Sequence, residues 1–94
     1  MKKQITFRHM NSSASLTDAA ESSIEKINRF NDEISSIDIT FTNDALKTVD
    51  IKVRVNGSTL AAKEESEELH KSLGEAEDKI IRQLRKWKTK HKGI

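Results

Sequence analysis

The chain has 94 residues, with 17 basic and 15 acidic side chains and neither cysteine nor proline. This length supports one domain, residues 1–94, with a modest core. The lack of cysteine excludes disulfides and thiolate metal sites, and no apolar run is long enough for a signal peptide or a membrane span. We therefore expect a cytoplasmic protein with no membrane partner.

A strand followed by a helix is predicted for the first third of the chain. Apolar and polar residues alternate over residues 3–10, as in a half-buried strand. Ser13 is the preferred N-cap of the helix, with Ser12 as the alternative, because a serine hydroxyl accepts an otherwise unbonded backbone N–H. We expect this helix to span residues 14–30. Its apolar side includes small residues, which suggest close approach to a sheet: Leu16, Ala19, Ala20, Ser23, Ile24, Ile27 and Phe30.

Three further strands are predicted at residues 37–42, 49–55 and 58–63. Asn56-Gly57 separates the last two, and this pair is the strongest short hairpin signal because a type I′ turn needs positive φ at both positions. A hairpin closed there places Val53 opposite Leu60, apolar against apolar. It also places Asp50 opposite Lys63 on the other face, so the predicted register is self-consistent.

The last predicted helix, residues 67–92, changes charge halfway along. Its apolar residues recur at helical spacing, which predicts a helix docked on a core: Leu69, Leu73, Ala76, Ile80, Leu84 and Trp87. From residue 79 onward every charged residue is basic: Lys79, Arg82, Arg85, Lys86, Lys88, Lys90 and Lys92. These seven cations exceed what the helix dipole favours and leave residues 1–78 with a net charge of −5. The segregation predicts a polyanionic partner, nucleic acid above all, although a solvated basic helix end is the simpler alternative.

The element order is therefore β-α-β-β-β-α. Each strand has one apolar face, and two amphipathic helices are available to cover it. This predicts an α+β two-layer sandwich, with a four-stranded mixed sheet and both helices on one face. A right-handed crossover through the first helix makes the first two strands parallel if they are adjacent. We expect the last helix to pack on Ile39, Phe41, Ile51, Val53 and Leu60.

Patterns typical of catalysis or metal binding are missing from the sequence. The histidines, His9, His70 and His91, have no ligand spacing, and the serines lie at caps and turns without a base and an orienting group. The three glycines form no phosphate-binding loop. We expect no enzyme activity, no metal and no cofactor. Trp87 has the chemistry to stack on a nucleobase, but its place on the apolar side of the helix favours core packing.

Several stretches together carry a family resemblance: Ile5-Thr6-Phe7, residues 13–16, Lys26-Ile27 before Phe30, Val55-Asn56-Gly57 and residues 78–88. Through them the chain resembles, nearly end to end, the short ribosome hibernation promoting factors, also called ribosome-associated inhibitors or ribosomal subunit interface proteins. The resemblance implies a fold similar to a double-stranded-RNA-binding domain. It further implies binding to the small ribosomal subunit, in the channel of the mRNA and tRNAs, and translation inhibition in stationary or starved cells.

The resemblance also implies which residues contact rRNA: Lys26, Arg29, Lys79, Arg82, Arg85, Lys86, Lys88 and Lys90. Such cations neutralise phosphates and recognise the shape of folded RNA rather than its base sequence. The implied partners are the small subunit and the whole ribosome, without a small-molecule substrate, and we expect a monomer away from the ribosome.

The chain departs from the family pattern in its first helix. Ser23 stands where a lysine is common, and Glu21 and Glu25 lie nearby. From this departure we expect a ribosome contact that is either weaker or shifted toward the last helix. Two alternative functions remain: a general module for structured RNA that acts away from the ribosome, and a degenerate paralogue that binds a protein.

Overall fold

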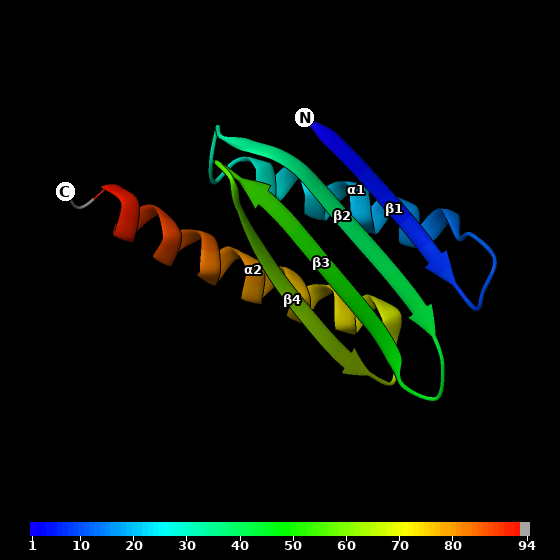
Figure 1. The fold of residues 1–94 in the computed structure, drawn as a ribbon. Coiled ribbons are helices and arrows are strands. Elements are labelled where there is room, and N and C mark those ends of the chain that lie inside the picture. Colours follow the sequence, from blue (N-terminus) through cyan, green and yellow to red (C-terminus); the bar gives the residue numbers. More distant parts are fainter. Residues whose placement is uncertain (93–94) are drawn as a thin grey trace.

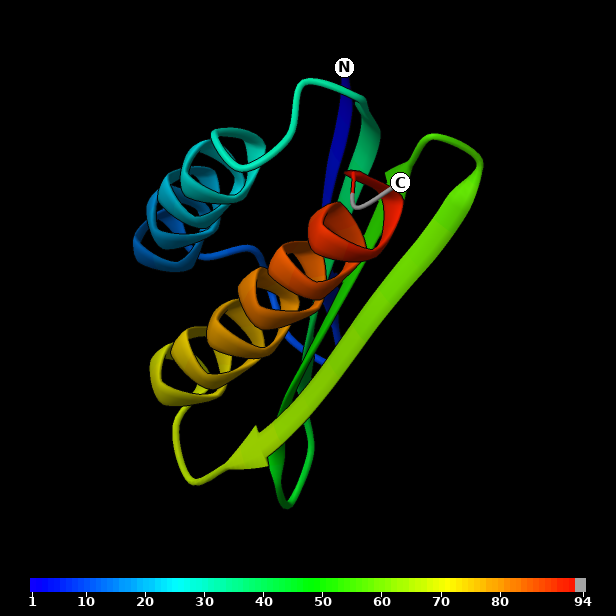
Figure 2. The ribbon, with the colours of Figure 1, turned by 90° about the vertical axis from the view of Figure 1, so that its left-hand side faces the viewer.

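The computed structural model describes residues 1–92, and their side chains as far as residue 88. Within this part six elements follow the predicted order: β1 (Lys2–Arg8), α1 (Ala14–Asn28), β2 (Ile34–Asn43), β3 (Lys47–Val55), β4 (Ser58–Ser66) and α2 (Leu69–Lys92). The strands form one sheet in the order β1-β2-β3-β4. Both helices lie behind this sheet in Figure 1, and the view along its edge shows them on one face only (Figure 2). The predicted two-layer α+β architecture is confirmed.

The strand pairing agrees with the sequence pattern. β1 runs parallel to β2, whereas β2, β3 and β4 are antiparallel to their neighbours in turn. The hairpin register places Val53 opposite Leu60 and Asp50 opposite Lys63, as predicted. Asn56 has φ 46° and Gly57 has φ 81°, so both turn residues adopt the left-handed conformation that a type I′ turn requires.

The element boundaries differ from prediction by a few residues. β1 ends at Arg8 because His9 has a φ of 59°, which breaks the extended backbone. α1 ends at Asn28 rather than at residue 30. β4 continues to Ser66, beyond its predicted end at residue 63. Its last four residues are all polar, so the alternation of apolar and polar residues that predicts a strand is absent there. α2 therefore begins at Leu69 and not at residue 67.

The core lies between the sheet and the two helices. The predicted apolar residues of α2 are confirmed as its buried side at Leu73, Ala76, Ile80 and Leu84, and the two end members, Leu69 and Trp87, are partly buried. The facing strand residues are fully buried: Ile37, Ile39, Phe41, Val49, Ile51 and Val53. Since Leu84 is only 1% exposed, the rotation of α2 about its axis is fixed, and with it the direction of the basic side chains.

The small residues of α1 allow contact with α2 as well as with the sheet. Ser13 caps this helix, with the Leu16 backbone N–H donating to Ser13 Oγ at 3.2 Å. Ser23 is buried and faces α2, where its hydroxyl donates to Glu77 Oε1 at 2.6 Å. The sequence pattern suggested only an approach to the sheet at this serine, whereas the structure shows a direct contact with the other helix.

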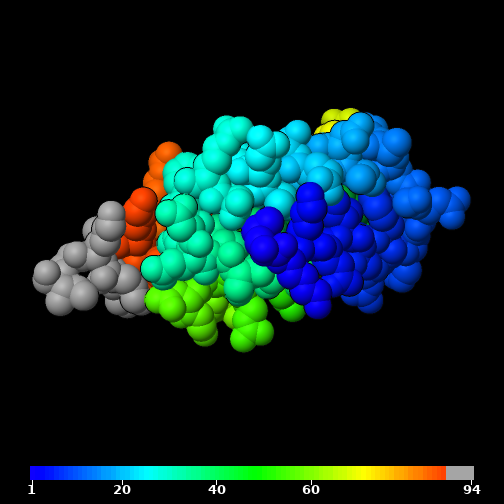
Figure 3. Space-filling view, turned by 90° about the horizontal axis from the view of Figure 1, so that it is seen from above, coloured from blue at the N-terminus to red at the C-terminus, as the bar shows by residue number. Residues whose placement is uncertain are grey.

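The two edges of the sheet have different surroundings. Seen from above, β1 (dark blue) lies at the surface beside α1 (lighter blue to cyan) (Figure 3). At the opposite edge, α2 packs against β4 and β3. None of the helices in the described part of the chain is long and apolar enough to cross a membrane.

Candidate nucleic-acid interface

The C-terminal half of α2 holds its basic side chains away from the core. Ile80 and Leu84 are almost completely buried and anchor this half on the sheet. Residues at other angles around the helix must therefore point outward. The basic residues of this segment whose side chains are described are all exposed: Lys79, Arg82, Arg85, Lys86 and Lys88.

One group of these cations lies on the side of α2 that faces β4. Lys79 forms an ion pair with Glu64 of β4, and one turn later Gln83 Nε2 donates to the backbone carbonyl of Ala61 at 2.9 Å. These two contacts join α2 to the outer edge of the sheet. Lys86 lines the same side, next to Arg82.

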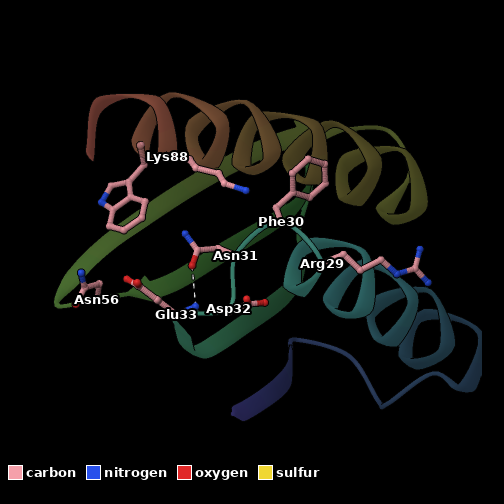
Figure 4. A pocket seen from close by; sticks show the side chains of 8 residues that line it. Arg29, Phe30, Asn31, Asp32, Glu33, Asn56 and Lys88 are labelled. Atoms are coloured by element: carbon pink, nitrogen blue, oxygen red, sulfur yellow. Dashed lines mark hydrogen bonds between the residues drawn. The ribbon is translucent and has the colours of Figure 1, made fainter. Parts of the chain in front are cut away.

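A second group lies on the side of α2 that faces the end of α1. The Arg85 guanidinium carbon lies 5.4 Å from the ring centre of Phe30, a cation–π arrangement. One turn along, Trp87 and Lys88 form one wall of a groove that the segment after α1 and the β3–β4 turn complete. Figure 4 shows Lys88 on this wall, the side chains of Phe30, Asn31 and Glu33 on the segment after α1, and Arg29 extending away from the groove. Trp87 is thus partly buried against the core while it also lines a surface groove.

The two cations predicted on α1 are both paired with carboxylates. Lys26 Nζ lies 3.1 Å from Glu77 Oε2 of α2, and Glu77 retains only 14% side-chain exposure. Arg29, the C-cap residue of α1, has its Nη2 3.0 Å from Oε1 of Glu25 one turn earlier, and both side chains are 72% exposed. With Asp18, Glu21 and Glu25 against Lys26 alone, α1 carries a net negative charge, in keeping with the expected shift of the contact toward the last helix.

The eight predicted contact residues therefore do not form one uniform patch. Within the described side chains, Arg82, Lys86 and Lys88 have no acidic partner, whereas Lys26, Arg29 and Lys79 each have one. The side chains of Lys90, His91 and Lys92 lie outside the described residues. Sequence reasoning missed the role of Phe30 beneath Arg85 and that of Glu77 between the helices. The Glu25–Arg29 pair had a detectable signal, because these residues are four apart on a helix.

The arrangement suits electrostatic recognition of an extended polyanion. Because core residues anchor the helix, its backbone is already ordered before binding, and several of its cations can neutralise phosphates along one surface. Among the described residues no group of three or more histidines, cysteines or carboxylates could hold a metal ion.

Comparison with known proteins points to one family. Residues 3–92 match the model of the family described as Sigma 54 modulation protein / S30EA ribosomal protein. The chain is 34% identical over 100 residues to a ribosome hibernation promotion factor of Picosynechococcus, and 24% identical over 94 residues to one of Deinococcus radiodurans. These alignments cover 99% and 94% of this chain but only 52% and 49% of the relatives, so the chain spans about half of their length.

Two solved structures have the same fold as this chain. A ribosomal subunit interface protein from Coxiella burnetii superposes with a TM-score of 0.86 at 33% identity, covering 95% of this chain and 99% of that one. The N-terminal domain of Protein Y from Thermus thermophilus superposes with a TM-score of 0.84 over 93% of this chain and 99% of that one. At 17% identity the second likeness shows the fold alone.

Proposed function

The chain belongs to the Sigma 54 modulation protein / S30EA ribosomal protein family, and we propose that it is a cytoplasmic ribosome hibernation factor. Ribosome hibernation factors are not enzymes, so the proposed inhibition works by occupancy of a site and not by chemistry. In this proposal residues 1–94 form one ribosome-binding domain, monomeric away from the ribosome. It occupies the channel of the small subunit where mRNA and tRNAs lie, and silences translation in stationary phase or stress.

The observation that carries the proposal is the set of exposed cations on α2 that lack acidic partners. Arg82, Lys86 and Lys88 are exposed and form no ion pair with any described residue. A phosphate surface therefore need not displace a carboxylate to reach them. The buried side of the same helix fixes in advance on which side of α2 these cations stand, so no backbone ordering has to accompany binding.

The core-anchored position of α2 makes a charge-reversal test possible. We expect Arg82→Glu/Lys86→Glu to abolish co-sedimentation with ribosomes and inhibition of translation in vitro, because both side chains lie at the surface and the fold should survive. The matched control is Lys2→Glu/Arg8→Glu on β1, which makes the same charge change at the opposite edge of the sheet. Retained ribosome binding by the folded α2 variant would contradict the proposal.

The salt dependence gives a second, quantitative measure. If about five phosphates are neutralised, log K should fall with log[salt] at a slope of roughly −3.5 to −4.5. A naked RNA hairpin should bind much more weakly, since only the assembled channel presents phosphates on several sides. Equal affinity for the hairpin and the ribosome would favour the general RNA-binding alternative, and recovery only in the soluble fraction would favour a protein partner.

A further inference from the structure

We propose that the groove between the outer edge of β4 and α2 binds a single-stranded RNA segment, with Lys63 and the β4 backbone as contact groups. This edge groove is lined by Ala61, Ala62, Lys63, Arg82, Gln83 and Lys86, among others. The inference rests on the proposed function and adds a strand surface to the cations of α2. In this proposal the side of α2 that faces β4 binds RNA in single-stranded form.

Two successive alanines of β4 lie beside the edge groove. The buried Ala62 faces the helices, where a larger side chain would fill the space between the strand and α2, whereas Ala61 is exposed on the open face of the sheet, opposite Lys52. Gln83 holds α2 beside the strand through its 2.9 Å hydrogen bond to the Ala61 carbonyl, and Lys79 does so through Glu64. The edge groove therefore lies between two elements that contact each other directly.

The hairpin register directs backbone donors into this groove. In a two-residue hairpin the residues flanking the turn, Val55 and Ser58, exchange hydrogen bonds, and bonded and non-bonded pairs then alternate along the strands. Ala61 and Lys63 both fall in non-bonded pairs, so their N–H and C=O groups point away from β3. The Gln83 contact to the Ala61 carbonyl fits this geometry. Since Gln83 occupies that carbonyl, the N–H groups of Ala61 and Lys63 are left as donors for an anion.

The charges around the edge groove have one sign. Lys63 projects from the strand, while Lys79, Arg82 and Lys86 project from the helix. None of the described residues that line the groove is acidic. Of the carboxylates beside it, Glu64 is paired with Lys79, and Asp50 lies opposite Lys63 on the open face of the sheet. Cations on both walls and backbone N–H groups at the floor are the contacts that a phosphodiester backbone uses.

The same geometry favours a single strand over a duplex. Because β4 and α2 touch through Gln83, the groove between them admits one backbone and not the two strands of a helix. The small side chains of Ala61 and Ala62 leave room beside the strand for the sugar–phosphate backbone of RNA, and contacts to this backbone do not depend on sequence. The edge groove should therefore accept oligouridylate and not a blunt RNA duplex.

The direct test is titration of the whole chain with a short oligouridylate, followed by backbone amide NMR. We expect the amide resonances of Ala61 and Lys63 to shift, and an equal concentration of blunt RNA duplex to leave them in place. Lys63→Gln should weaken oligouridylate binding about three- to tenfold and reduce the salt slope by about 1. The matched control, Lys2→Gln, removes an exposed lysine from the opposite edge strand and should change neither value.

A second variant tests the backbone donor itself. Ala61→Pro removes an N–H that points away from β3, and an edge strand tolerates proline at such a position. We expect it to weaken oligouridylate binding, whereas Thr59→Pro removes an equivalent N–H nearer the turn, outside the groove, and should bind like the unchanged chain. If Ala61→Pro fails to fold, Lys63→Gln still decides the question.

The possible outcomes separate this inference from the proposed function. If the amide resonances of Ala61 and Lys63 do not shift with oligouridylate while ribosome binding is intact, the groove inference alone is overturned. Equal losses in Lys63→Gln and Lys2→Gln would also overturn it, since the effect would be one of total charge. If these resonances shift but the chain does not bind ribosomes, the result supports RNA binding in the edge groove and contradicts the proposed function.

Discussion

Glu77 should couple stability and RNA affinity in opposite directions. Its carboxylate accepts a 2.6 Å hydrogen bond from the buried hydroxyl of Ser23 and lies 3.1 Å from the ammonium of Lys26. Glu77→Ala leaves the serine hydroxyl buried without this acceptor, which costs about 1–3 kcal/mol. The Lys26 pair adds at most about 1 kcal/mol because the lysine is half exposed. A total loss near 2 kcal/mol would lower Tm by about 8–16 °C.

The same change releases Lys26 from its carboxylate. If Lys26 faces rRNA as predicted, Glu77→Ala should leave ribosome affinity equal or higher and steepen the salt slope by about 0.7–0.9. Glu77→Gln separates the two effects, because the amide still accepts from Ser23 but no longer pairs with Lys26. It should show the steeper slope with a loss of stability no greater than about 1 kcal/mol.

Thermal unfolding and ribosome co-sedimentation over a salt series measure both quantities. A double-mutant cycle of Ser23→Ala with Glu77→Ala should give a coupling energy of about 1.5–3 kcal/mol, the range for a hydrogen bond to a charged group. An unchanged Tm in Glu77→Ala would refute the structural role of the Ser23 bond. An unchanged slope in both variants would remove Lys26 from the set of contact residues.

Two further predictions concern α1 and α2 as helices. Ser13→Ala should lower the free energy of unfolding by about 1 kcal/mol in denaturant titration, because the Leu16 N–H loses its cap, with ribosome affinity unchanged. Lost affinity at normal stability would instead place Ser13 in the contact surface. Gly74→Ala should raise the free energy of unfolding by about 1 kcal/mol, since Gly74 is exposed within α2 and an added Cβ meets nothing within 4 Å. A lower stability would mean that the glycine has a role beyond helix propensity.

Local patterns were sufficient to predict most of the fold. Asn56-Gly57 determined the register of the hairpin, because only one pairing places apolar residues opposite one another around a two-residue turn. The helical spacing of the apolar residues determined which side of α2 is buried, and Leu84 confirms it. Both features depend on residues close together in the chain, whose geometry the backbone period controls.

The charge environment of the candidate interface was harder to predict. Ser23 and Glu77 are 54 residues apart, and their contact depends on how closely two helices settle over one sheet. The neutralisation of Lys26 follows from that contact, so the sequence alone could not distinguish Lys26 from the unpaired cations of α2. The Lys79–Glu64 pair was missed for a related reason: it required β4 to extend beyond its predicted end.

The outer edge of β1 has a consequence for self-association. An uncovered edge strand presents backbone N–H and C=O groups to which another strand can bond. At high concentration the same edge of a second copy can pair with it and extend the sheet. β1 begins with Lys2 and Lys3 and ends with Arg8, and of these Lys3 is paired, with Glu21. Two such edges brought together would place lysines and arginines against each other. Like-charge repulsion therefore opposes sheet extension from copy to copy, and the protein can accumulate in many copies without forming polymers through β1.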